Sequence, residues 1–361
     1  MSIDVGIVVK VVVTGGAGFL GANLVRALRD AEPAWGISVL DNLSTGSRAN
    51  LDGIPGVVLH QASIMDDTAL DAVMGHADAV VHLAAQTSVQ RSVIDPIMAH
   101  EINATGTLKV LDAARRAAVR QVILASSSSV YGATAGSLPL HEALPTAPLS
   151  SYGASKLSAE SYALAFSHCH GVPVLVLRLF NVFGPLQRAD GIYAPAIPAF
   201  VTAAAEGRPL SIFGDGLQSR DFTYVGSVCD TIVDAVRRRV ASDRPVNLGF
   251  GTRRALLDVI DELSLIFDRQ LQRMHSAARP GDMRDAQANP TRLLSLFPNS
   301  QPTDFGVGLK ATVSWFLGGD RSRPRGAGAV RAVGAGTVSR REVARALKLS
   351  RFVSARAAWR D

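Results

Sequence analysis

The stretch Thr14-Gly15-Gly16-Ala17-Gly18-Phe19-Leu20-Gly21 decides how this chain folds, because three of its glycines are spaced three residues apart. A short β-branched run at 7–13 precedes it, and a helix-like stretch follows at once. In such a strand–turn–helix unit, Gly15 permits the tight turn, Gly18 lets the backbone approach a pyrophosphate, and Gly21 lets the helix pack close to the strand. The stretch therefore predicts a phosphate site at the start of a helix.

An acidic residue strengthens this interpretation. Asp41 stands 20 residues after Gly21, at the end of the second apolar run. A carboxylate at this place accepts hydrogen bonds from the adenosine ribose hydroxyls and repels a 2′-phosphate. Arg48 weakly favours NADP instead, since it is close enough in the sequence to meet a phosphate. We predict a dinucleotide site that takes NAD rather than NADP.

The apolar runs that follow predict the fold class. They alternate with helix-like stretches over roughly the first 180 residues, which is typical of an α/β fold with a doubly wound parallel sheet, the Rossmann type. After Asn181, prolines and glycines break the chain into short elements, which suits a smaller C-terminal substrate-binding lobe. We expect the NAD-binding domain to span 1–180, with 221–250 returning to it. The substrate lobe would comprise 181–220 and 251–318, followed by a basic extension at 319–361.

Composition excludes several classes of function. Of the 37 Lys and Arg residues, 11 lie in 321–361, which holds only 2 of the 31 Asp and Glu residues. Residues 1–320 therefore carry 26 basic and 29 acidic side chains, and this body does not resemble a nucleic-acid binder. We expect the basic segment to be a solvated or partly disordered extension, with contact to an anion, a membrane or a nucleic acid as the alternative.

The remaining compositional signals concern location and metals. Two cysteines without a CxxC pair point to a reducing, cytoplasmic setting. The sequence contains no run of 18 apolar residues and no signal-peptide pattern, so we expect no membrane partner. His168-Cys169-His170 resembles a metal cluster only superficially, because adjacent side chains on a helix diverge, and we predict no metal site.

Two polar segments suggest catalysis. Tyr152-Gly-Ala-Ser-Lys156 places a phenol and an ammonium four residues apart, on one face of a helix. The positive charge is expected to lower the pKa of the phenol, which then serves as a general acid or base. The alternative is a surface tyrosine and lysine on an amphipathic helix. The serines at 126–129 follow an apolar run, where a strand of an open α/β sheet presents its ligand-binding end.

Together these segments resemble the extended short-chain dehydrogenase/reductases, in particular the NAD-dependent nucleotide-sugar epimerase/dehydratase family. The resemblance spans nearly all of 8–318. It rests on the glycine stretch and on further motifs that occur in the family's order: Asp41–Gly46, His82–Ala85, Asn103, the serine run, Tyr152–Lys156, Arg178–Gly184, Gly214–Asp221 and Arg279–Asp282.

The resemblance implies the role of each matching residue. Tyr152 is the expected base, Lys156 its partner and a ligand of the nicotinamide ribose, and Ser127 the hydroxyl that bonds the sugar O4. The implied cofactor residues are Gly15, Gly18, Phe19, Leu20, Gly21, Asp41, Asn42, Thr45, Gly46, Ser63, Ile64, Leu83, Ala84, Ala85, Asn103, Tyr152, Lys156 and Phe180. The implied nucleotide-sugar residues are Ser88, Ser127, Ser128, Asn181, Ala196, Ile197, Phe213, Arg220, Arg279, Asp282 and Ala286. Ser63 and the pair Gly226-Ser227 depart from the family, which usually has acidic residues at these places.

The residues after Ser127 favour one reaction. Related 4,6-dehydratases carry an Asp-Glu pair there and the nucleotide-glucuronate decarboxylases a glutamate, whereas this chain has Ser128 and Ser129. The resemblance therefore implies 4-epimerisation of a UDP-hexose or, since Ala286 is small where hexose-specific relatives have tyrosine, of UDP-GlcNAc and UDP-GalNAc. A dehydratase, a glucuronate epimerase or decarboxylase, and a 4-ketoreductase remain alternatives, as does a non-enzymatic NAD sensor on the same fold. The family leads us to expect a homodimer.

Overall fold

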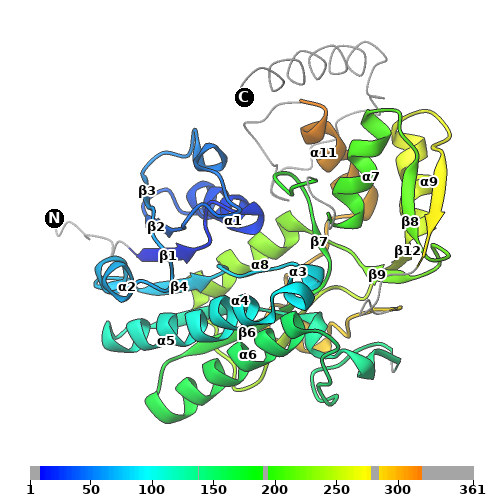
Figure 1. Ribbon diagram of the computed structural model, residues 1–361. Coiled ribbons are helices and arrows are strands. Elements are labelled where there is room, and N and C mark those ends of the chain that lie inside the picture. Colours follow the sequence, from blue (N-terminus) through cyan, green and yellow to red (C-terminus); the bar gives the residue numbers. More distant parts are fainter. Residues whose placement is uncertain (1–8, 137, 190–193, 278–283, 319–361) are drawn as a thin grey trace.

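The computed structural model describes residues 9–136, 138–189, 194–277 and 284–318. Its centre is a seven-stranded parallel sheet in the order β11-β6-β5-β4-β1-β2-β3. The chain therefore starts in the middle of the sheet, builds one half outward, and then crosses back to build the other half (Figure 1). The strands are β1 (Lys10–Thr14), β2 (Gly36–Leu40), β3 (Val57–His60), β4 (Ala79–His82), β5 (Gln121–Ser127), β6 (Val174–Leu179) and β11 (Val246–Leu248). This order confirms the predicted doubly wound Rossmann sheet.

Helices cover both faces of this sheet. One face carries α1 (Phe19–Ala31) and α8 (Val225–Arg238), which pack side by side. The other face carries α2, α5 and α6, and Figure 1 shows α4, α5 and α6 as a layer on that side. These helices and their short neighbours are α2 (Asp67–Met74), α3 (Val89–Ile94), α4 (Pro96–His100), the π-helical η2 (Glu101–Thr105), α5 (Gly106–Arg116) and α6 (Ser151–His170).

The two hydrophobic cores follow from the alternation of side chains along the strands. Val11 and Val13 of β1 point into the core beneath α1 and α8, whereas Val12 between them points into the core beneath α2, α5 and α6. Val80 and Val81 of β4 divide in the same way. Both faces are apolar, so the strands read as continuous β-branched runs rather than as alternating patterns.

The smaller lobe lies beyond the carboxyl end of the sheet and is built from short elements (Figure 1). Its strands form two-stranded pairs: β8 (Leu210–Phe213) with β13 (Arg273–Ser276), and β9 (Ser219–Asp221) with β12 (Arg253–Ala255). A third pair, β7 (Val182–Phe183) with β10 (Thr223–Tyr224), connects this lobe to α8. The helices are α7 (Ala196–Ala205), α9 (Leu256–Ile266), α10 (Thr291–Leu296) and α11 (Phe305–Phe316), and the chain also forms the short turns η1 (Arg48–Leu51), η3 (Ser128–Val130) and η4 (Ala133–Gly136).

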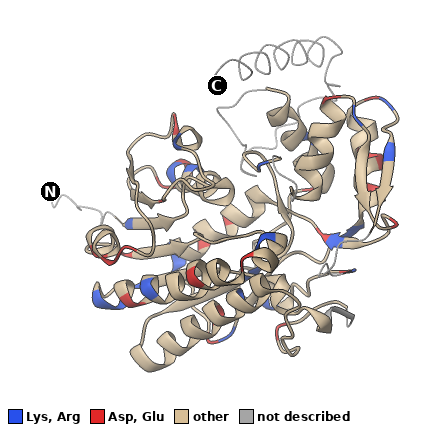
Figure 2. Ribbon diagram, viewed as in Figure 1, with Lys and Arg blue, Asp and Glu red and all other residues tan. Residues whose placement is uncertain are grey.

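Charged residues lie mainly on the outer helices and loops, while the ribbon of the central sheet is largely uncharged (Figure 2). None of the helices in the described part of the chain is both long and apolar enough to cross a membrane. The basic segment 319–361, which we predicted to be an extension, falls outside the described residues.

Candidate active site

The glycine turn joins β1 to α1 with little free space around its glycines. Gly15 adopts φ +69°, and a Cβ there would lie 2.7 Å from the backbone nitrogen of Ala84. A Cβ on Gly21 would lie 2.2 Å from the carbonyl oxygen of Gly15, so only glycine lets α1 approach this closely. The helix begins after Gly18 without a side-chain cap and without an acidic residue in its first turn. Its first N–H groups and the positive end of its dipole are therefore available to a phosphate.

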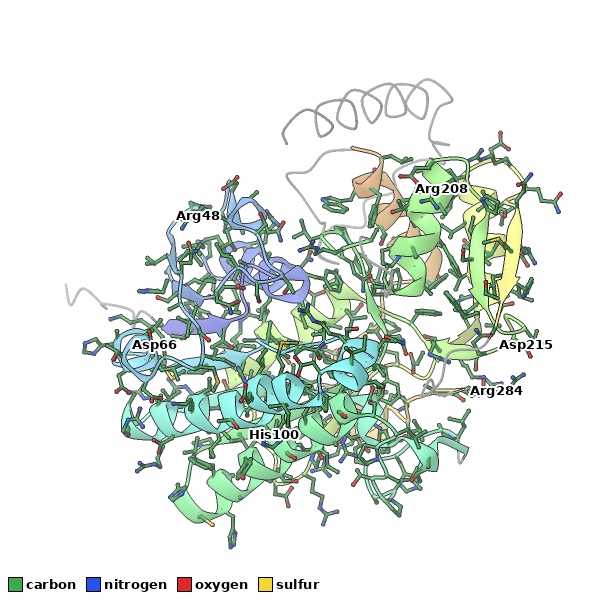
Figure 3. All side chains as sticks on the ribbon, in the orientation of Figure 1. Arg48, Asp66, His100, Arg208, Asp215 and Arg284 are labelled. Carbon is green, nitrogen blue, oxygen red and sulfur yellow. The ribbon has the colours of Figure 1, made fainter. Side chains whose placement is uncertain are left out.

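Asp41 lies where β2 ends, beside this turn. Its carboxylate is 8% exposed and accepts hydrogen bonds from the backbone nitrogens of Ala17 at 2.9 Å and Leu43 at 2.8 Å. Each bond uses one carboxylate oxygen, which leaves further lone pairs for ribose hydroxyls. Thr45 is exposed next to it, and its carbonyl oxygen accepts a bond of 3.0 Å from Nη1 of Arg188. Arg48 lies in the exposed turn beyond (Figure 3), so the structure places a carboxylate rather than a guanidinium at the end of β2.

The three residues predicted to be catalytic come together at the carboxyl end of β5. Ser127 is the last residue of this strand, and its side chain accepts a bond from the backbone nitrogen of Ser129 at 3.1 Å. Ser150 caps the start of α6, which brings Tyr152 into the first turn of this helix. The hydroxyls of Tyr152 and Ser127 share a hydrogen bond, and Lys156, one turn further along α6, is 4% exposed.

The protonation equilibria of these groups correct one expectation. Burial raises the pKa of the Tyr152 phenol above its ordinary value, with the hydrogen bond to Ser127 acting in the opposite direction. The pKa of this phenol is therefore raised, not lowered as we expected, because desolvation outweighs the contact with Ser127. Burial also lowers the pKa of Lys156 itself to about 8, while the charge of Glu160 raises it.

A buried chain of hydrogen bonds links the glycine turn to the helices. Thr107 donates its hydroxyl proton to the carbonyl oxygen of Asn103 at 2.5 Å, so its oxygen must accept from Nε2 of His82, 3.0 Å away. Nδ1 of His82 then accepts from the hydroxyl of Thr14 at 2.6 Å. Burial, followed by the charge of Lys156, lowers the pKa of His82 to about 3, which fits this neutral form. His82 is thus a structural link, a role that its place in the motif His82–Ala85 had not indicated.

Asn103 connects this chain to the catalytic helix. Its Nδ2 donates to the carbonyl oxygen of Gln86 at 3.0 Å and to Oγ of Ser155 at 2.9 Å, and its Oδ1 accepts from the nitrogen of Gln86 at 2.8 Å. Ser155 in turn donates to the carbonyl oxygen of Tyr152. Both amide protons of Asn103 are used within the protein, so only its oxygen retains capacity for the predicted contact with a cofactor.

The other predicted cofactor residues fall into three groups. Leu83, Ala84 and Ala85 are half-buried where β4 ends, next to the glycine turn, and Phe19 and Leu20 are half-buried at the start of α1. Ile64 and Phe180 are buried in the hydrophobic cores, Phe180 completely. These two side chains pack beneath the site and have little or no exposed surface for contact with a cofactor. The exposed or half-buried remainder of the predicted set comprises Asn42, Gly46 and Ser63.

A cavity of about 550 Å³ lies between the sheet edge and the smaller lobe. Its lining includes six of the predicted substrate residues, which are Ser88, Asn181, Ala196, Ile197, Phe213 and Arg220. Arg220 is 8% exposed, and its Nη1 donates to the carbonyl oxygens of Ser219 and Arg284, each at 2.9 Å. Arg284 pairs with Asp215 near the rim of this lobe (Figure 3).

Not every predicted substrate residue reaches this cavity. Ala286 is fully buried, its nitrogen donates to the carbonyl oxygen of Ser219, and it does not belong to the cavity lining. Ser127 and Ser128 do not belong to the cavity lining either, while Arg279 and Asp282 fall outside the described residues.

The cavity also has lining residues that we did not predict. Gln218 donates to the carbonyl oxygen of Phe213 at 2.6 Å, and its buried Oε1 has no protein partner. Thr202 likewise presents a buried hydroxyl without a protein partner. Both residues line the cavity and offer hydrogen bonds to a polar ligand. Gln218 belongs to the motif Gly214–Asp221 and so had a signal in the sequence, whereas Thr202 lies in ordinary helical sequence.

Comparison with known proteins identifies the family to which this chain belongs. The sequence model described as the NAD dependent epimerase/dehydratase family matches residues 11–249. The chain belongs to this family. Its cofactor is NAD, as the glycine turn and Asp41 predicted, and the free N-terminus of α1 beside a carboxylate fits a dinucleotide.

The chain aligns with individual relatives over most of its length. It is 34% identical to the UDP-glucose 4-epimerase of Azospirillum brasilense over 328 residues, which cover 85% of this chain and 91% of that relative. It is also 34% identical to a dTDP-glucose 4,6-dehydratase of Streptomyces antibioticus over 315 residues, which cover 85% and 92%. Among solved structures, UDP-N-acetylglucosamine 4-epimerase from Methanobrevibacter ruminantium, in complex with UDP-N-acetylmuramic acid, matches with a TM-score of 0.81 and 32% identity over 86% of this chain and 99% of that chain.

The described residues contain no group of three His, Cys, Asp or Glu side chains arranged to hold a metal ion. Cys229 is buried, Cys169 is exposed, and neither forms a disulfide.

Proposed function

We propose that this protein is a nucleotide-sugar 4-epimerase that uses NAD to oxidise the sugar transiently at C4. The observation that carries the proposal is the turn after β5. Ser127, bonded to Tyr152, is followed by buried Ser128 and half-buried Ser129, neither of which is an acid. Glu160, a buried carboxylate nearby, is bound to Arg178. Among the described residues around this turn, Tyr152 is therefore the acid–base group, where elimination or decarboxylation in relatives uses additional carboxylates.

The proposed chemistry follows from the three residues. Tyr152 removes the proton from O4 of the sugar, and Ser127 holds that oxygen and the phenol in line. Lys156 favours the phenolate through its positive charge and, as in relatives, binds the nicotinamide ribose. NAD, held by the glycine turn and Asp41, would supply reversible hydride exchange with C4, and inversion requires that the two faces of the keto sugar meet it in turn. Tyr152 then gives its proton back to O4, so the reaction has no net consumption of cofactor.

The substrate would be a UDP-hexose or a UDP-N-acetylhexosamine. The cavity suits a nucleotide diphosphate, since Phe213 offers an aromatic face for the base and Arg220 a guanidinium for the diphosphate. Arg279 and Asp282 would complete the diphosphate and ribose contacts. Small Ala286 favours UDP-GlcNAc and UDP-GalNAc as substrates, acting as part of the wall behind the sugar.

The proposed enzyme would work as a cytoplasmic homodimer. Val93, Ile94 and Ile97 are 63%, 70% and 68% exposed on α3 and α4, and Tyr162 on α6 is 42% exposed. Helices α4 and α6 belong to the layer that Figure 1 shows below the sheet, and α3 packs against both of them. A second copy would cover them, whereas a monomer would leave an apolar patch in water. Sedimentation of the purified protein measures this directly.

The test of the function is product analysis. The purified protein is incubated with UDP-glucose, UDP-GlcNAc, UDP-glucuronate and dTDP-glucose in turn, and the sugars are separated after the reaction. We expect the C4 epimer of a UDP-sugar to form without net change in absorbance of reduced nicotinamide. A 4-keto-6-deoxy sugar would identify a dehydratase, a pentose a decarboxylase, and net oxidation or reduction of nicotinamide a ketoreductase. Binding of NAD without any product would indicate a sensor.

A further inference from the structure

A buried carboxylate lies one helical turn beyond Lys156 on α6, and the proposed chemistry does not use it. Glu160 is 3% exposed and forms an ion pair with Arg178 of β6, whose side chain is 4% exposed. Nε of Arg178 donates to Oε2 of Glu160 at 3.0 Å. Ser126, the neighbour of Ser127 on β5, donates its hydroxyl to the same oxygen at 2.9 Å. Two strands therefore hold this carboxylate in one position.

Arg178 is fixed in turn on its other side. Its guanidinium carbon lies 4.8 Å from the centroid of the Tyr131 ring. The hydroxyl of Tyr131 donates to Oδ1 of Asn247 at 2.7 Å, and Nδ2 of Asn247 donates to the carbonyl oxygen of Leu140 at 2.9 Å. The ion pair is thus enclosed by aromatic and polar contacts, and it cannot move toward solvent without breaking them. The carboxylate of Glu160 therefore keeps a fixed position, and its negative charge stabilises a positive charge on a neighbouring group.

Lys156 is the group on which this charge acts. Burial lowers the pKa of Lys156 to about 8, and the negative charge of Glu160 acts in the opposite direction. Tyr152 from α6 and His82 from β4 are neutral, because burial raises the pKa of the phenol and lowers that of the imidazole. Arg178 from β6 lies behind Glu160 and is bound to it.

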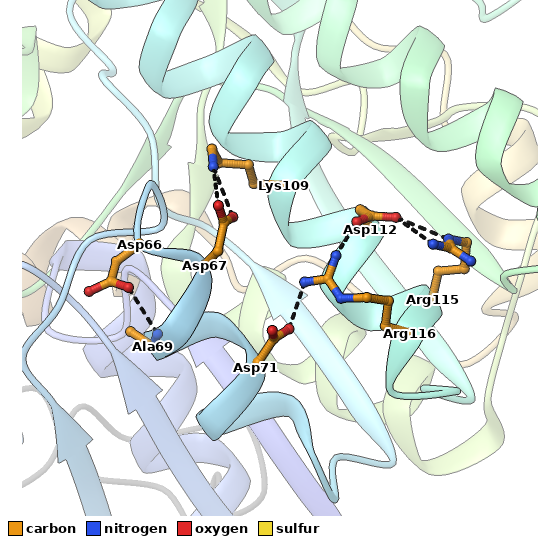
Figure 4. Close-up of polar contacts among 8 residues, drawn as sticks. All are labelled: Asp66, Asp67, Ala69, Asp71, Lys109, Asp112, Arg115 and Arg116. Carbon is orange, nitrogen blue, oxygen red and sulfur yellow. Dashed lines mark hydrogen bonds and ion pairs between the residues drawn. The ribbon is translucent and has the colours of Figure 1, made fainter.

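The other charged side chains of the helices packed against α6 lie at the outer surface. On α5, Lys109 pairs with Asp67 at 2.7 Å, while Arg116 pairs with Asp71 at 2.6 Å (Figure 4). The carboxylates of Asp67 and Asp71 therefore pair with cations at the surface and not with groups in the core. The full set on α3, α4, η2 and α5, together with the N-cap of α4, is Arg91, Asp95, His100, Glu101, Lys109, Asp112, Arg115 and Arg116. Within the described core, the carboxylate that acts on Lys156 is that of Glu160.

We propose that Glu160 is a positioning residue of the reaction, because its fixed carboxylate keeps Lys156 an ammonium ion inside the core. The inference rests on the proposed function only for the roles of Lys156 and Tyr152. Without this charge, desolvation would favour the neutral amine, which does not favour a phenolate at Tyr152. Ser126 and Arg178 serve this role by holding the carboxylate in place.

The protonation of Lys156 can be measured directly. The chain has five lysines, which are Lys10, Lys109, Lys156, Lys310 and Lys348. Protein labelled with ¹³C at lysine Cε therefore gives few signals, and a Lys156→Met variant assigns the one of interest. The test variant is Glu160→Gln with Arg178→Met, because neutralising both partners avoids a buried unpaired charge. Loss of Glu160 lowers the pKa of Lys156 and loss of Arg178 raises it, but Arg178 lies behind Glu160, so the carboxylate has the larger effect and we expect the transition of Lys156 to move to lower pH. The decline of kcat at high pH should move in the same direction.

Two further variants separate this role from a merely structural one. Tyr131→Phe keeps the ring over Arg178 but removes the hydroxyl and its contacts with Asn247 and Arg178. Because the ion pair of Arg178 with Glu160 remains, this variant should lower the unfolding temperature and leave the Lys156 transition unchanged. Ser126→Ala keeps the ion pair but frees one side of Glu160, and it should give a smaller shift to lower pH even if the double variant does not fold. An unchanged Lys156 transition in the double variant or in Ser126→Ala, or an equal shift in Tyr131→Phe, would overturn the proposal. These spectra need no substrate, so they remain decisive if no epimerase activity is found.

Discussion

Replacing Gly21 with alanine should separate the packing role of the glycine turn from its binding role. A Cβ at this position would lie 2.2 Å from the carbonyl oxygen of Gly15 and 2.5 Å from Cα of Gly16. Both neighbours are backbone atoms of the turn, so α1 must move away from β1. Overpacking typically costs about 1–3 kcal/mol, and contact with backbone atoms places Gly21 at the upper end of this range. Alanine recovers about 1 kcal/mol of helix propensity, which leaves a loss of about 2 kcal/mol.

This loss has a measurable consequence. For a domain of about 150–250 residues, which includes the size of the predicted NAD-binding domain, about 2 kcal/mol corresponds to a fall of roughly 4–8 °C in the unfolding temperature. Thermal unfolding followed by circular dichroism measures the fall, and the nucleotide released on denaturation measures how much NAD remains bound. We expect both the unfolding temperature and the NAD content of Gly21→Ala to decrease.

Two other glycines provide matched controls. A Cβ on Gly18 would meet only the carbonyl oxygen of Gly15 at 3.3 Å, so Gly18→Ala should fold almost normally while the added methyl group hinders the pyrophosphate. On Gly36, a Cβ would have its nearest neighbour, Cγ of Lys10, at 3.5 Å, so Gly36→Ala should change neither property. A Gly21→Ala protein that unfolds at the wild-type temperature with a full complement of NAD would refute the reasoning.

Three further outcomes are expected. Tyr152→Phe should lose 10²–10⁴-fold in kcat, as is typical for a general acid–base group, while calorimetry shows nearly unchanged nucleotide-sugar binding; retention of more than about a tenth of the rate would contradict the role. Truncation after Gly318 should leave the rate of epimerisation unchanged, since every catalytic motif lies upstream, and a loss of activity or folding would assign the tail to the pocket or dimer. The wild type should convert UDP-GlcNAc at least as well as UDP-glucose, and Ala286→Tyr should abolish the first activity and spare the second, measured as kcat/KM. Because Ala286 is fully buried, a tyrosine there costs roughly 1–3 kcal/mol, so the unfolding temperature is measured alongside, and equal loss of both activities would exclude Ala286 as the gate.

Much of the fold was accessible from the sequence because its signals are local. The glycine turn, the β-branched strands and the acidic residue after β2 lie within about 35 residues of one another, and each constrains its own backbone. The strand order confirms the predicted Rossmann sheet, and the family model confirms the family and NAD as cofactor. The boundaries of the smaller lobe are harder to predict, because its strands are only two to four residues long and pair across loops.

The candidate site was predictable as a set of residue types but not as an arrangement. The pattern from Tyr152 to Lys156 indicates one helical face, yet it says nothing about which strand lies beneath that face. The structure brings Ser127 to the phenol across 25 positions of sequence and buries Lys156 beside Glu160. Burial is a property of the assembled layers, and it reverses the expected shift of the Tyr152 pKa.

By itself, the sequence determined the dinucleotide turn, the candidate acid–base residues and the absence of a carboxylate directly after Ser127, because each depends on side-chain chemistry or on a few neighbouring backbone angles. Only the tertiary structure decided that His82 is a neutral link between Thr14 and Thr107, that Phe180 and Ala286 are enclosed, and that Glu160 and Arg178 form a buried pair behind Lys156. These facts depend on distances between segments far apart in the chain and on the exclusion of water between them, and no local pattern encodes either.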